Sequence, residues 1–525
     1  MKKFTFAILS LLLAATGFAK EVTQSEAVEV AQRMMKQKNV SVTQVSSVTP
    51  VVFNGKRAYY AVQFQSGGWV LVSADDVVAP VMGYSENGSF PVLNMPDNMR
   101  GWLDLGAEQA NELKKLTNKR NSAWDKAEVL PMVASDKVSP LIKVQWNQTS
   151  PYNAYCPSKN GSSRAVVGCV AVGMAQAMSV ARYPERPEGK VSYNSSVYGS
   201  IVCDFSKEPA YNWSEIISGE NNKDGVARLL WHCGAATKMD YSPSGSGTQT
   251  SYVASALKNY FGYSKSVSYI SRSDYSDKEW NSTILSELKE GRPIVYCGFP
   301  SDGTAGHCFN LDGYDGTFYH VNWGWGGAGD AYFSLDNLAA QVVVGGDVMA
   351  FTEGHGMVIG IKAPNEDPID ITLSNTSVAI NQPVGTVVAT VTVDSEAKDP
   401  KYSYKVQGPY SVILKKNLPV PFDVKDGNLV TTEVITLDDK YLSKDPFTGA
   451  SAYEVNITAT NDATGKSCSK KFSIMVKNSS GVNDVVFDEN APVEYFNLQG
   501  IKVSNPENGI YIKRQGTKAE KVILR

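Results

Sequence analysis

The sequence predicts a multidomain α+β protein, with two α+β regions followed by a β-sandwich and a short terminal β segment. A capped amphipathic helix and alternating strands characterise residues 20–130, while a buried helix and a turn-forming Asp-Gly pair characterise residues 131–365. Residues 366–480 change to short alternating strands such as "GTVVATVTV". With 525 residues the chain is too long for one hydrophobic core, so we expect separate domains.

The first residues have the pattern of a secretory signal peptide. Two lysines precede an apolar run over residues 4–15, and the small-x-small motif Gly17-Phe18-Ala19 follows it. Residues 1–19 are therefore predicted to be removed by cleavage after Ala19, which makes the mature protein an exported one. The run is too short for a permanent membrane helix, and no later stretch reaches the roughly 18 apolar residues that such a helix needs.

Residues 20–130 are the first folding unit that the sequence predicts. Thr23 and Glu26 make a capping box in front of an amphipathic helix. "AYYAVQFQSGGWVLVSAD" predicts two strands joined at Gly67-Gly68, and a second helix is expected over residues 98–116. The polar stretch "TNKRNSAWDKAE" that follows is predicted to be an exposed linker that a protease can cut.

Composition excludes some classes of function. The formal net charge is −3 and the pI about 6.0, so no basic surface favours binding to nucleic acid. The seven cysteines are an odd number, so at least one thiol is left over if the others form disulfides. Their spacing indicates no zinc site.

The stretch "VNWGWGGAG" at residues 321–329 matches G-x-G-x-x-G, a feature of dinucleotide-binding loops. Such a loop needs a following helix whose N-terminus binds phosphate, but the next residues, "DAYFSLDNL", predict a short strand and a turn. We therefore reject the dinucleotide interpretation. The glycines instead let the chain turn close to a cleft, and Asn322, Trp323 and Trp325 need another role.

Cys169 is the candidate nucleophile. A helix is predicted from Cys169 to Tyr183, where Pro184 stops it, and its small apolar residues indicate that it is buried. A thiol at a helix N-terminus lies at the positive end of the helix dipole, which stabilises thiolate and lowers the thiol pKa. From position alone, a core cysteine or half of a disulfide is an equally good explanation of Cys169.

His307 is the candidate base. "GHCFNLDGYDGTFYHVNWGW" predicts a β-hairpin with a two-residue turn at Asp315-Gly316. That register places His307 opposite Gly324 and puts Asn322 on the same face, diagonal to the histidine. An asparagine amide there can orient the imidazole, so the cysteine, His307 and Asn322 fit an arrangement of nucleophile, base and orienting group.

The other histidines are weaker candidates. His232 lies in an apolar helical run and is expected to be a hydrogen-bonded core residue, and His320 is expected to support the sheet. His355, in a glycine-rich loop, is the serious rival as base. Cys308 follows His307 directly, so its side chain is predicted on the opposite face of the strand, in the core.

Four stretches together resemble the streptopain family of papain-fold cysteine peptidases: "GCVAVGMAQAM", "YSPSGSG", "GHCFNLDGYD" and "FYHVNWGWGGAGDAYF". "GGWVLVSADDVVAPVMGYS" resembles that family's inhibitory propeptide. The resemblance covers residues 20 to 363 and implies a papain-like catalytic domain, preceded by a small α+β propeptide that acts as an intramolecular inhibitor. It implies protein or peptide substrates and neither a cofactor nor a metal ion.

The resemblance also implies roles for individual residues. They are Cys169 as nucleophile, His307 as base, Gln148 as oxyanion-hole donor, Asn322 and Trp323 beside the imidazole, and Ser246 and Gly306 as substrate contacts. Cys308 departs from the family, which more usually has a plain apolar residue there, and it leaves a second thiol near the site.

The C-terminal parts carry resemblances of their own. Residues 366–480 resemble a cadherin-type β-sandwich without the aspartate-rich calcium motifs, so no calcium is expected. Residues 484–525, with "YFNLQGIKV" and "NGIYIKR", resemble the sorting domain read by the type IX (Por) secretion system, the alternative being an ordinary β-hairpin extension. This resemblance implies the outer-membrane secretion machinery as a partner, and a secreted or cell-surface protein exported through the periplasm.

The sequence thus predicts a secreted cysteine endopeptidase that is made as a zymogen. The thiolate of Cys169 would attack the peptide carbonyl, and protonated His307 would give its proton to the leaving amine. Two alternatives stay open. One is a surface binding or adhesion protein with an inactive papain-like domain, and the other is a Cys-His amidase or acyltransferase that acts on non-peptide substrates.

Overall fold

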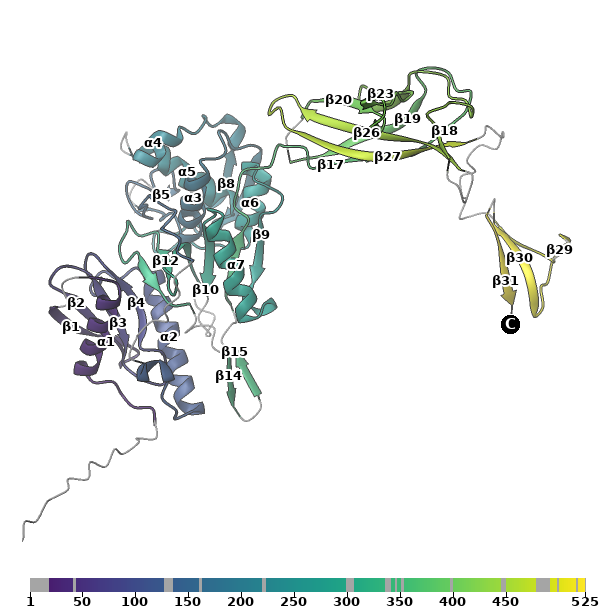
Figure 1. Cartoon of the computed structure of the whole chain (residues 1–525). Coiled ribbons are helices and arrows are strands. Elements are labelled where there is room, and N and C mark those ends of the chain that lie inside the picture. Colours follow the sequence, from purple (N-terminus) through teal and green to yellow (C-terminus); the bar gives the residue numbers. More distant parts are fainter. Residues whose placement is uncertain are drawn as a thin grey trace, which may run out of the picture. The chain divides into compact units, whose positions relative to one another are not determined.

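The computed structural model of the chain consists of two compact units, Met1–Pro364 and Asn365–Arg525 (Figure 1). The described residues are 18–40, 44–126, 136–159, 163–219, 223–298, 306–335, 341–344, 347–350, 354–396, 400–444, 450–477, 492–497, 500–515 and 518–524. The predicted signal peptide falls outside them up to residue 17. Among the described residues, no helix is long and apolar enough to cross a membrane.

A ten-stranded sheet forms the centre of the first unit, with the strand order β1-β2-β3-β4-β13-β12-β11-β10-β16-β9. Its early strands are β1 (Val45–Phe53), β2 (Lys56–Phe64), β3 (Trp69–Ser73) and β4 (Val81–Ser85). The later ones are β9 (Ser268–Ser271), β10 (Ile294–Gly298), β11 (His307–Tyr314), β12 (Tyr319–Asn322), β13 (Ala331–Phe333) and β16 (Gly356–Ile359). The two sets join where β4 pairs with β13, with Tyr84 opposite Tyr332. The region before residue 126 therefore shares one sheet with the region that carries Cys169 and His307.

Helices cover both faces of this sheet. The helices of this unit are α1 (Gln24–Gln37), α2 (Asp97–Leu116), α3 (Cys169–Ala181), α4 (Trp213–Ser218), α5 (Asp224–Ala236), α6 (Tyr252–Phe261) and α7 (Asp277–Lys289), of which α4 and α5 pack on other helices. At β11, α3 packs on the face that carries Cys308, while α2 and α7 pack on the face that carries Phe309. Helix α3 ends two residues before the predicted Tyr183, because Arg182 adopts a left-handed conformation with φ of 51°.

Short elements complete this unit. Three two-stranded sheets are described outside the main one: β5 (Ser158–Lys159) with β6 (Ser163–Arg164), β7 (Lys190–Ser195) with β8 (Gly199–Asp204), and β14 (Gln341–Val344) with β15 (Asp347–Ala350). Short 3₁₀ helices span Ser122–Asp125, Phe205–Lys207 and Arg272–Asp274.

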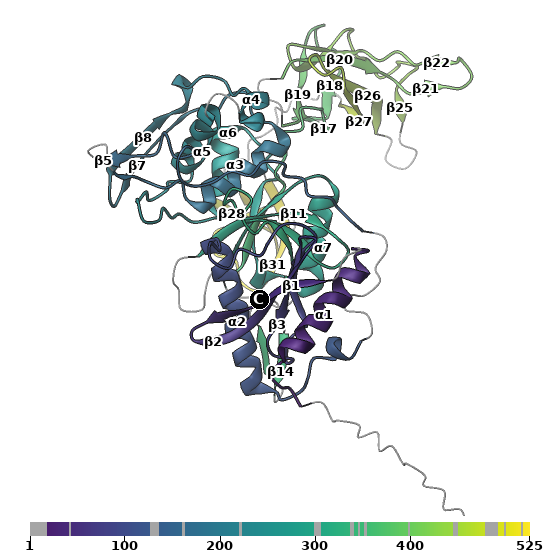
Figure 2. The ribbon, with the colours of Figure 1, turned by 90° about the vertical axis from the view of Figure 1, so that its left-hand side faces the viewer.

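Helix α1 confirms the predicted capping box. The Thr23 hydroxyl accepts a hydrogen bond from the Glu26 amide at 3.2 Å, and the Glu26 carboxylate accepts one from the Thr23 amide at 2.8 Å. The helix packs against β2 and β3 through its predicted apolar face (Figure 2). That face consists of Ala27, Val30, Ala31, Met34 and Met35, each at most 2% exposed. The local sequence signal and the tertiary packing therefore agree.

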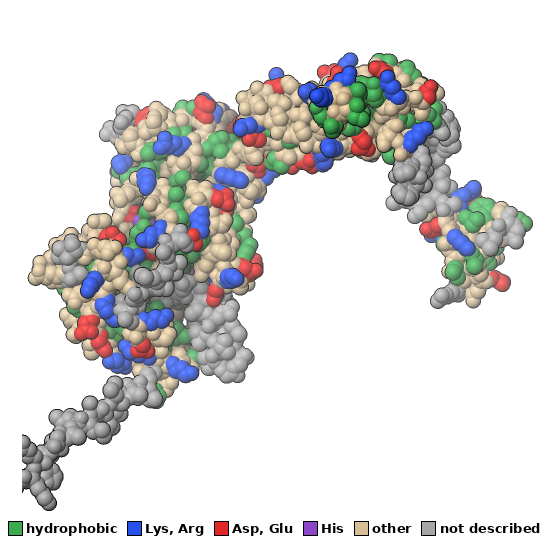
Figure 3. Space-filling model, viewed as in Figure 1, with side chains coloured by type: hydrophobic (Ala, Val, Ile, Leu, Met, Phe, Trp, Pro, Cys, Tyr) green, Lys and Arg blue, Asp and Glu red, His purple; other side chains and the backbone are tan. Residues whose placement is uncertain are grey.

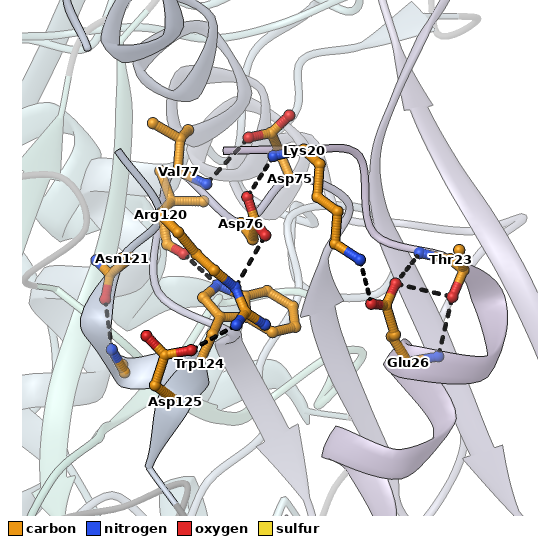
Figure 4. A network of polar contacts seen from close by, with 12 residues as sticks. Lys20, Thr23, Glu26, Asp75, Asp76, Val77, Arg120, Asn121, Trp124 and Asp125 are labelled. Carbon is orange, nitrogen blue, oxygen red and sulfur yellow. Dashed lines mark hydrogen bonds and ion pairs between the residues drawn. The ribbon is translucent and has the colours of Figure 1, made fainter. Parts of the chain in front are cut away.

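The predicted linker after α2 is only partly exposed over residues 117–125, because this stretch is anchored at Arg120 and Trp124 (Figure 4). Trp124 is only 7% exposed, and its indole nitrogen donates to the Val78 carbonyl oxygen at 2.7 Å. The Arg120 guanidinium lies 3.0 Å from the buried Asp76 carboxylate and also pairs with Asp125. A buried tryptophan and a set of ion pairs therefore hold this polar stretch on the N-terminal region. The polar composition of the stretch gave no sign of this docking.

The second unit confirms the predicted β-sandwich. One sheet has the order β17-β19-β24-β23, and the other has the order β18-β27-β26-β20 with β25 paired to β26. Their bounds are β17 (Asp370–Leu373), β18 (Ser377–Ala379), β19 (Val387–Asp394), β20 (Tyr402–Gln407), β23 (Phe422–Lys425), β24 (Asn428–Thr431), β25 (Ser443–Lys444), β26 (Ser451–Asn461) and β27 (Ser467–Lys477). The two sheets enclose an apolar core with Leu429, Tyr453 and Ile474 at its centre.

Two smaller β elements belong to the same unit. A hairpin of β21 (Tyr410–Ser411) and β22 (Lys416–Asn417) lies between β20 and β23 in the chain. The last residues form a sheet of β28 (Val493–Phe496), β29 (Lys502–Val503), β30 (Gly509–Gln515) and β31 (Lys518–Leu524), in the order β29-β28-β30-β31.

Candidate active site

Cys169 is the first residue of α3, as the sequence predicted. Gly168 before it has φ of 91°, and a β-carbon there would lie 2.6 Å from the Met239 methyl group and 3.0 Å from the Ser246 carbonyl oxygen. Only glycine fits this sharp entry into the helix. As a whole residue Cys169 is partly exposed at the N-terminus of α3, whereas its sulfur is surrounded by protein atoms.

The expected low pKa of Cys169 is not found in this structure. Burial raises the pKa of the thiol, while the backbone N–H groups of Cys308, Val170 and Cys169 favour the thiolate and act in the opposite direction. The amides surround the sulfur as a nucleophile requires, but the loss of hydration outweighs them. A positive partner is therefore needed to make the thiolate.

His307 starts β11, where it pairs with Gly298 of β10. Its ring lies against α2: a β-carbon at Gly101 would be 2.2 Å from the imidazole Cδ2 and 2.3 Å from Nε2. Burial lowers the pKa of His307, and the nearby Asp97 carboxylate partly offsets this. The imidazole is thus buried against a helix from outside the region that carries Cys169, and this burial disfavours its charged form.

Cys169 and His307 line the same cleft, which has a volume of about 750 Å³. Gln148, Ser246 and Gly306 line it too, so the cleft brings together five of the seven predicted site residues. Among the described contacts, however, no hydrogen bond or ion pair joins the Cys169 sulfur to the His307 ring. The candidate nucleophile and the candidate base therefore line one cleft without a described hydrogen bond between them.

Asn98 of α2 also reaches into this region. It is 1% exposed, and its amide nitrogen donates to the Cys308 carbonyl oxygen at 3.2 Å and to the Trp323 carbonyl oxygen. Helix α2 therefore contacts the His307 ring and also bonds the backbone of β11 at Cys308 and the backbone after β12 at Trp323. Sequence reasoning missed Asn98 and Gly101, because only the docking of α2 gives them a role.

The predicted hairpin register is wrong by one residue or more. Asn310 pairs with Asn322 and Tyr314 pairs with Tyr319, so the loop has four residues instead of two, and a bulge follows Leu311. Asp315 explains the wider loop: its carboxylate accepts from the amides of Thr317 and Phe318 at 2.8 and 2.7 Å. The same carboxylate contacts Lys38 and Tyr84 of the N-terminal region.

The shifted register moves Asn322 to the other face of the sheet, away from the His307 ring. Asn322 is 3% exposed, donates to the Val144 carbonyl oxygen at 3.2 Å and accepts from the Gly324 amide at 3.0 Å. Trp323 lies on the face of Phe309, with ring centroids 4.8 Å apart, and thus on the side of His307. In this structure the Asn322 side chain bonds the backbone around the end of β12, and its role beside the imidazole stays a prediction.

Gln148 and Ser246 take different positions on the cleft wall. Gln148 is 7% exposed. Its backbone carbonyl oxygen accepts a hydrogen bond from the Val167 amide at 2.9 Å, which ties this residue to the loop before Cys169. The Ser246 hydroxyl donates to the Val166 carbonyl oxygen at 2.7 Å and accepts from the Ser242 amide at 3.0 Å. Ser246 therefore fixes the shape of the cleft rim with its own hydroxyl.

Comparison with known proteins identifies the family of the chain. The sequence profile of the Peptidase C10 family matches residues 146–333, and that of the Spi protease inhibitor matches residues 19–110. Streptopain from Streptococcus pyogenes is 35% identical over 328 residues, which are 58% of this chain and 80% of that protein. The chain belongs to the peptidase C10 family. It is a cysteine peptidase with an inhibitory propeptide domain, as the sequence predicted.

Two other relatives are similar over comparable lengths. The thiol protease/hemagglutinin PrtT of Porphyromonas gingivalis is 32% identical over 400 residues, which are 70% of this chain and 45% of that protein. A solved fragment of prointerpain A from Prevotella intermedia has 28% identity and a TM-score of 0.48, and the match covers 60% of this chain and 99% of that fragment.

The glycines of the G-x-G-x-x-G stretch have a packing role in this C10 peptidase. A β-carbon on Gly324 would lie 2.9 Å from Val172 of α3, one on Gly327 would lie 2.5 Å from Gln145, and one on Gly329 would lie 2.7 Å from Met99 of α2. All three have positive φ. The stretch therefore passes between α3, the segment before Gln148 and the propeptide.

The other three histidines are all hydrogen-bonded to neighbouring side chains. His232 accepts from or donates to the Tyr211 hydroxyl at 2.7 Å, and His320 pairs with Asp312 at 2.6 Å. His355 contacts the Tyr296 hydroxyl at 3.0 Å and is 3% exposed. The rival base therefore lies in the core and does not line the cleft with the nucleophile.

Cys308 lies on the face of β11 opposite to His307, as predicted. A β-carbon on Gly173 of α3 would lie 3.3 Å from the Cys308 sulfur, which places this thiol against α3. All seven cysteines of the peptidase are free thiols in the structure.

Proposed function

We propose that the chain is an exported cysteine endopeptidase in which Cys169 is the nucleophile and His307 is the base. One observation carries the proposal: both residues line one cleft, and the propeptide helix α2 contacts the His307 ring at Gly101. Cys308 also lines this cleft, but its sulfur faces Gly173 in the core, whereas Cys169 begins helix α3 with backbone N–H groups around its sulfur. In this proposal the propeptide keeps the enzyme latent by keeping the pair apart.

Release of α2 starts the reaction. Without Gly101 and Asn98 against it, His307 is free to turn toward Cys169 and take the thiol proton, which gives a thiolate–imidazolium pair. The thiolate then forms a bond to the scissile carbonyl carbon. The negative charge on the carbonyl oxygen is stabilised by the Gln148 side chain and the Cys169 amide.

The imidazolium then completes the cycle. It gives its proton to the amine, which leaves as the carbon–nitrogen bond breaks, and the acyl group stays on the Cys169 sulfur. Neutral His307 next takes a proton from water, whose oxygen attacks the thioester and releases the acid and the thiol. We propose that Trp323 shields the turned imidazole, and that Asn322 and Gly306 shape its surroundings.

Removal of the propeptide requires cleavage of an internal peptide bond, which supports endopeptidase activity. Residues 117–125 are docked on the propeptide, so we place the cleavage after them, between residues 126 and 137. The peptidase domain then extends from about residue 131 to 365, and the propeptide covers residues 20–130.

Export rests on the two ends of the chain. We propose that residues 1–19 are a signal peptide, that residues 366–480 are a cadherin-like module, and that the sheet within residues 484–525 is the sorting domain that the outer-membrane secretion machinery reads. Fractionation of cells that make a chain ending at residue 483 tests the last point. We expect active enzyme to stay in the periplasm, and normal release to the medium would refute the sorting role.

The proposed activity is tested with purified full-length protein and a peptide library. We expect the protein to cleave internal bonds of the peptides, and this activity should rise as the propeptide is lost. A thiol-alkylating agent should abolish it. Cys169→Ala is the matched control and should cleave nothing. Absence of peptide cleavage by processed wild-type protein would favour the binding-protein alternative, and turnover of simple amides alone would favour the amidase alternative.

A further inference from the structure

The β21–β22 hairpin of the second unit presents an apolar tip to solvent. Tyr410 is 62% exposed, and the consecutive residues Val412, Ile413 and Leu414 are 80%, 92% and 54% exposed. Figure 2 shows the hairpin extending beyond the strands of the sandwich. Scattered single apolar residues are normal on a protein surface, but four large ones on one tip indicate a binding site.

The tip is a defined structure. Tyr410 pairs with Asn417 and Ser411 pairs with Lys416, and the Leu414 amide donates to the Ser411 hydroxyl at 3.2 Å. Its base is closed by hydrogen bonds between Gly408 and the Leu418 carbonyl oxygen at 3.1 Å, and between Leu418 and the Pro409 carbonyl oxygen at 2.9 Å. The apolar side chains are therefore held outward and do not collapse onto the sandwich core.

Positive charge accompanies the tip. From Tyr402 to Phe422 the chain has Lys405, Lys415 and Lys416 and no Asp or Glu, although the whole chain has a net charge of −3. Lys415 and Lys416 follow the apolar residues directly and are exposed. Over the sandwich, Figure 3 shows hydrophobic side chains gathered beside Lys and Arg side chains. The local charge thus complements an anionic surface.

The shape of the tip favours a lipid surface over a protein partner. A stable protein interface buries about 800 Å² on each partner and is broad, whereas the two-stranded tip offers a few side chains on a narrow projection. A projecting apolar end with cations behind it matches the layers of a bilayer, in which acyl chains lie beneath anionic phosphates.

We propose that the β21–β22 tip inserts Val412, Ile413 and Leu414 into the interface of a bilayer that contains anionic phospholipid, with Lys415 and Lys416 at the phosphates. The sandwich then holds the protein on a membrane surface. This inference is independent of the peptidase mechanism, because no residue of the cleft takes part.

Vesicle co-sedimentation of the full chain tests the proposal, with Cys169→Ala as background so that the protein stays intact. The probes are phosphatidylcholine vesicles with and without phosphatidylserine. We expect binding that requires phosphatidylserine. The triple variant Val412→Ser/Ile413→Ser/Leu414→Ser should bind at least about 100-fold more weakly, because serine gains no free energy when it moves from water into the apolar layer. Lys415→Gln/Lys416→Gln should bind about 30-fold more weakly.

The matched control is Val384→Ser/Val387→Ser, which removes apolar residues that are 61% and 59% exposed in the same unit but outside the hairpin. It should bind like the parent protein, and all variants should keep its melting temperature. No binding to phosphatidylserine vesicles, or binding that the tip variants leave unchanged, would overturn the proposal. A parent dimer in light scattering that the tip variant dissociates would also overturn it, by assigning the tip to contact between two copies of the chain.

Discussion

The imidazole of His307 lies directly on the backbone of Gly101, with no room for a side chain between them. A β-carbon at position 101 would be 2.2 Å from the ring, closer than any real contact of this kind. Asn98, one helical turn earlier, holds the backbone carbonyl oxygens of Cys308 and Trp323. One face of the propeptide helix is therefore shaped to the base of the proposed catalytic pair, and a single methyl group should disturb it.

Gly101→Ala should weaken latency. The added methyl group collides with the ring, and such overpacking costs about 1–3 kcal/mol, or about 5- to 150-fold in the equilibrium that holds α2 on the cleft. Alanine also stabilises a helix by about 1 kcal/mol over glycine, so a loss of inhibition cannot come from a weaker helix. The rate of propeptide loss by purified full-length protein measures the effect. Lys115→Ala, on the exposed side of the same helix, is the control and should mature at the normal rate.

Maturation should depend on Cys169 and not on Cys308. Full-length Cys169→Ala should accumulate unprocessed, and a trace of mature wild-type enzyme should release from it a fragment that begins between residues 126 and 137. Cys308→Ala should process itself, because its thiol faces Gly173 in the core. Intact-mass spectrometry distinguishes the forms. Unaided processing of the Cys169 variant together with failure of the Cys308 variant would show that the wrong thiol has been assigned.

Gln148→Ala should lower kcat of the mature enzyme by about 10²–10³, the typical loss of one oxyanion-hole donor, with KM little changed. The split between kcat and KM matters, because a merely structural role at the cleft wall would disturb substrate binding as well. Ser246→Ala is a useful comparison and should change KM more than kcat, because its hydroxyl bonds the rim of the cleft. Near-normal turnover of the Gln148 variant would remove this residue from the site.

The zymogen should lose stability as the pH falls below about 6.5. Burial lowers the pKa of His355 to about 4 and that of His232 to about 3, and Arg272 contributes to the shift of His355. Above pH 6.5 both histidines are neutral in the folded and in the unfolded chain. Below pH 6.5 the histidines of the unfolded chain bind protons, while those of the folded chain do not. Each histidine therefore lowers the free energy of unfolding by about 1.4 kcal/mol per pH unit, until the pH reaches its folded pKa.

The substitution His355→Gln isolates this contribution. Glutamine does not titrate and can still bond the Tyr296 hydroxyl, so the variant should show a shallower loss of unfolding free energy between pH 6.5 and 4. Denaturant melts of the Cys169→Ala protein over that range give the slope. An unchanged slope in the glutamine variant would mean that other groups control the acid sensitivity.

Local signals in the sequence predicted the elements well. Thr23 and Glu26 define the start of α1, and Gly168 and Cys169 define the start of α3. Both helix starts depend only on residues that are close together in the sequence. The existence of the β11–β12 hairpin was equally clear. Its register was not, since the Asp315 carboxylate, held by Lys38 and Tyr84 from the propeptide, selects a four-residue loop over the two-residue turn.

The other wrong or missed predictions have the same physical cause, a contact between distant parts of the chain. Residues 117–125 look like a polar linker until Trp124 and Arg120 meet Val78 and Asp76. Gly101 looks like an ordinary helix glycine until His307 lies on it. In each case a contact between distant parts of the chain decides the outcome, and a single sequence does not contain the information about which parts meet.

The central claim is that the propeptide keeps His307 from Cys169, and the pKa of the Cys169 thiol tests it most directly. The rate of alkylation of Cys169 is measured against pH in wild-type protein, with mass spectrometry separating alkylated zymogen from alkylated mature enzyme in the same reaction. In the zymogen we expect a thiol pKa above its ordinary value of about 8.5, because burial dominates. In the mature enzyme we expect it well below that value, because the imidazolium then stabilises the thiolate. A His307→Ala chain that a trace of mature wild-type enzyme has processed should not show this fall. The same thiol pKa in both forms would contradict the claim.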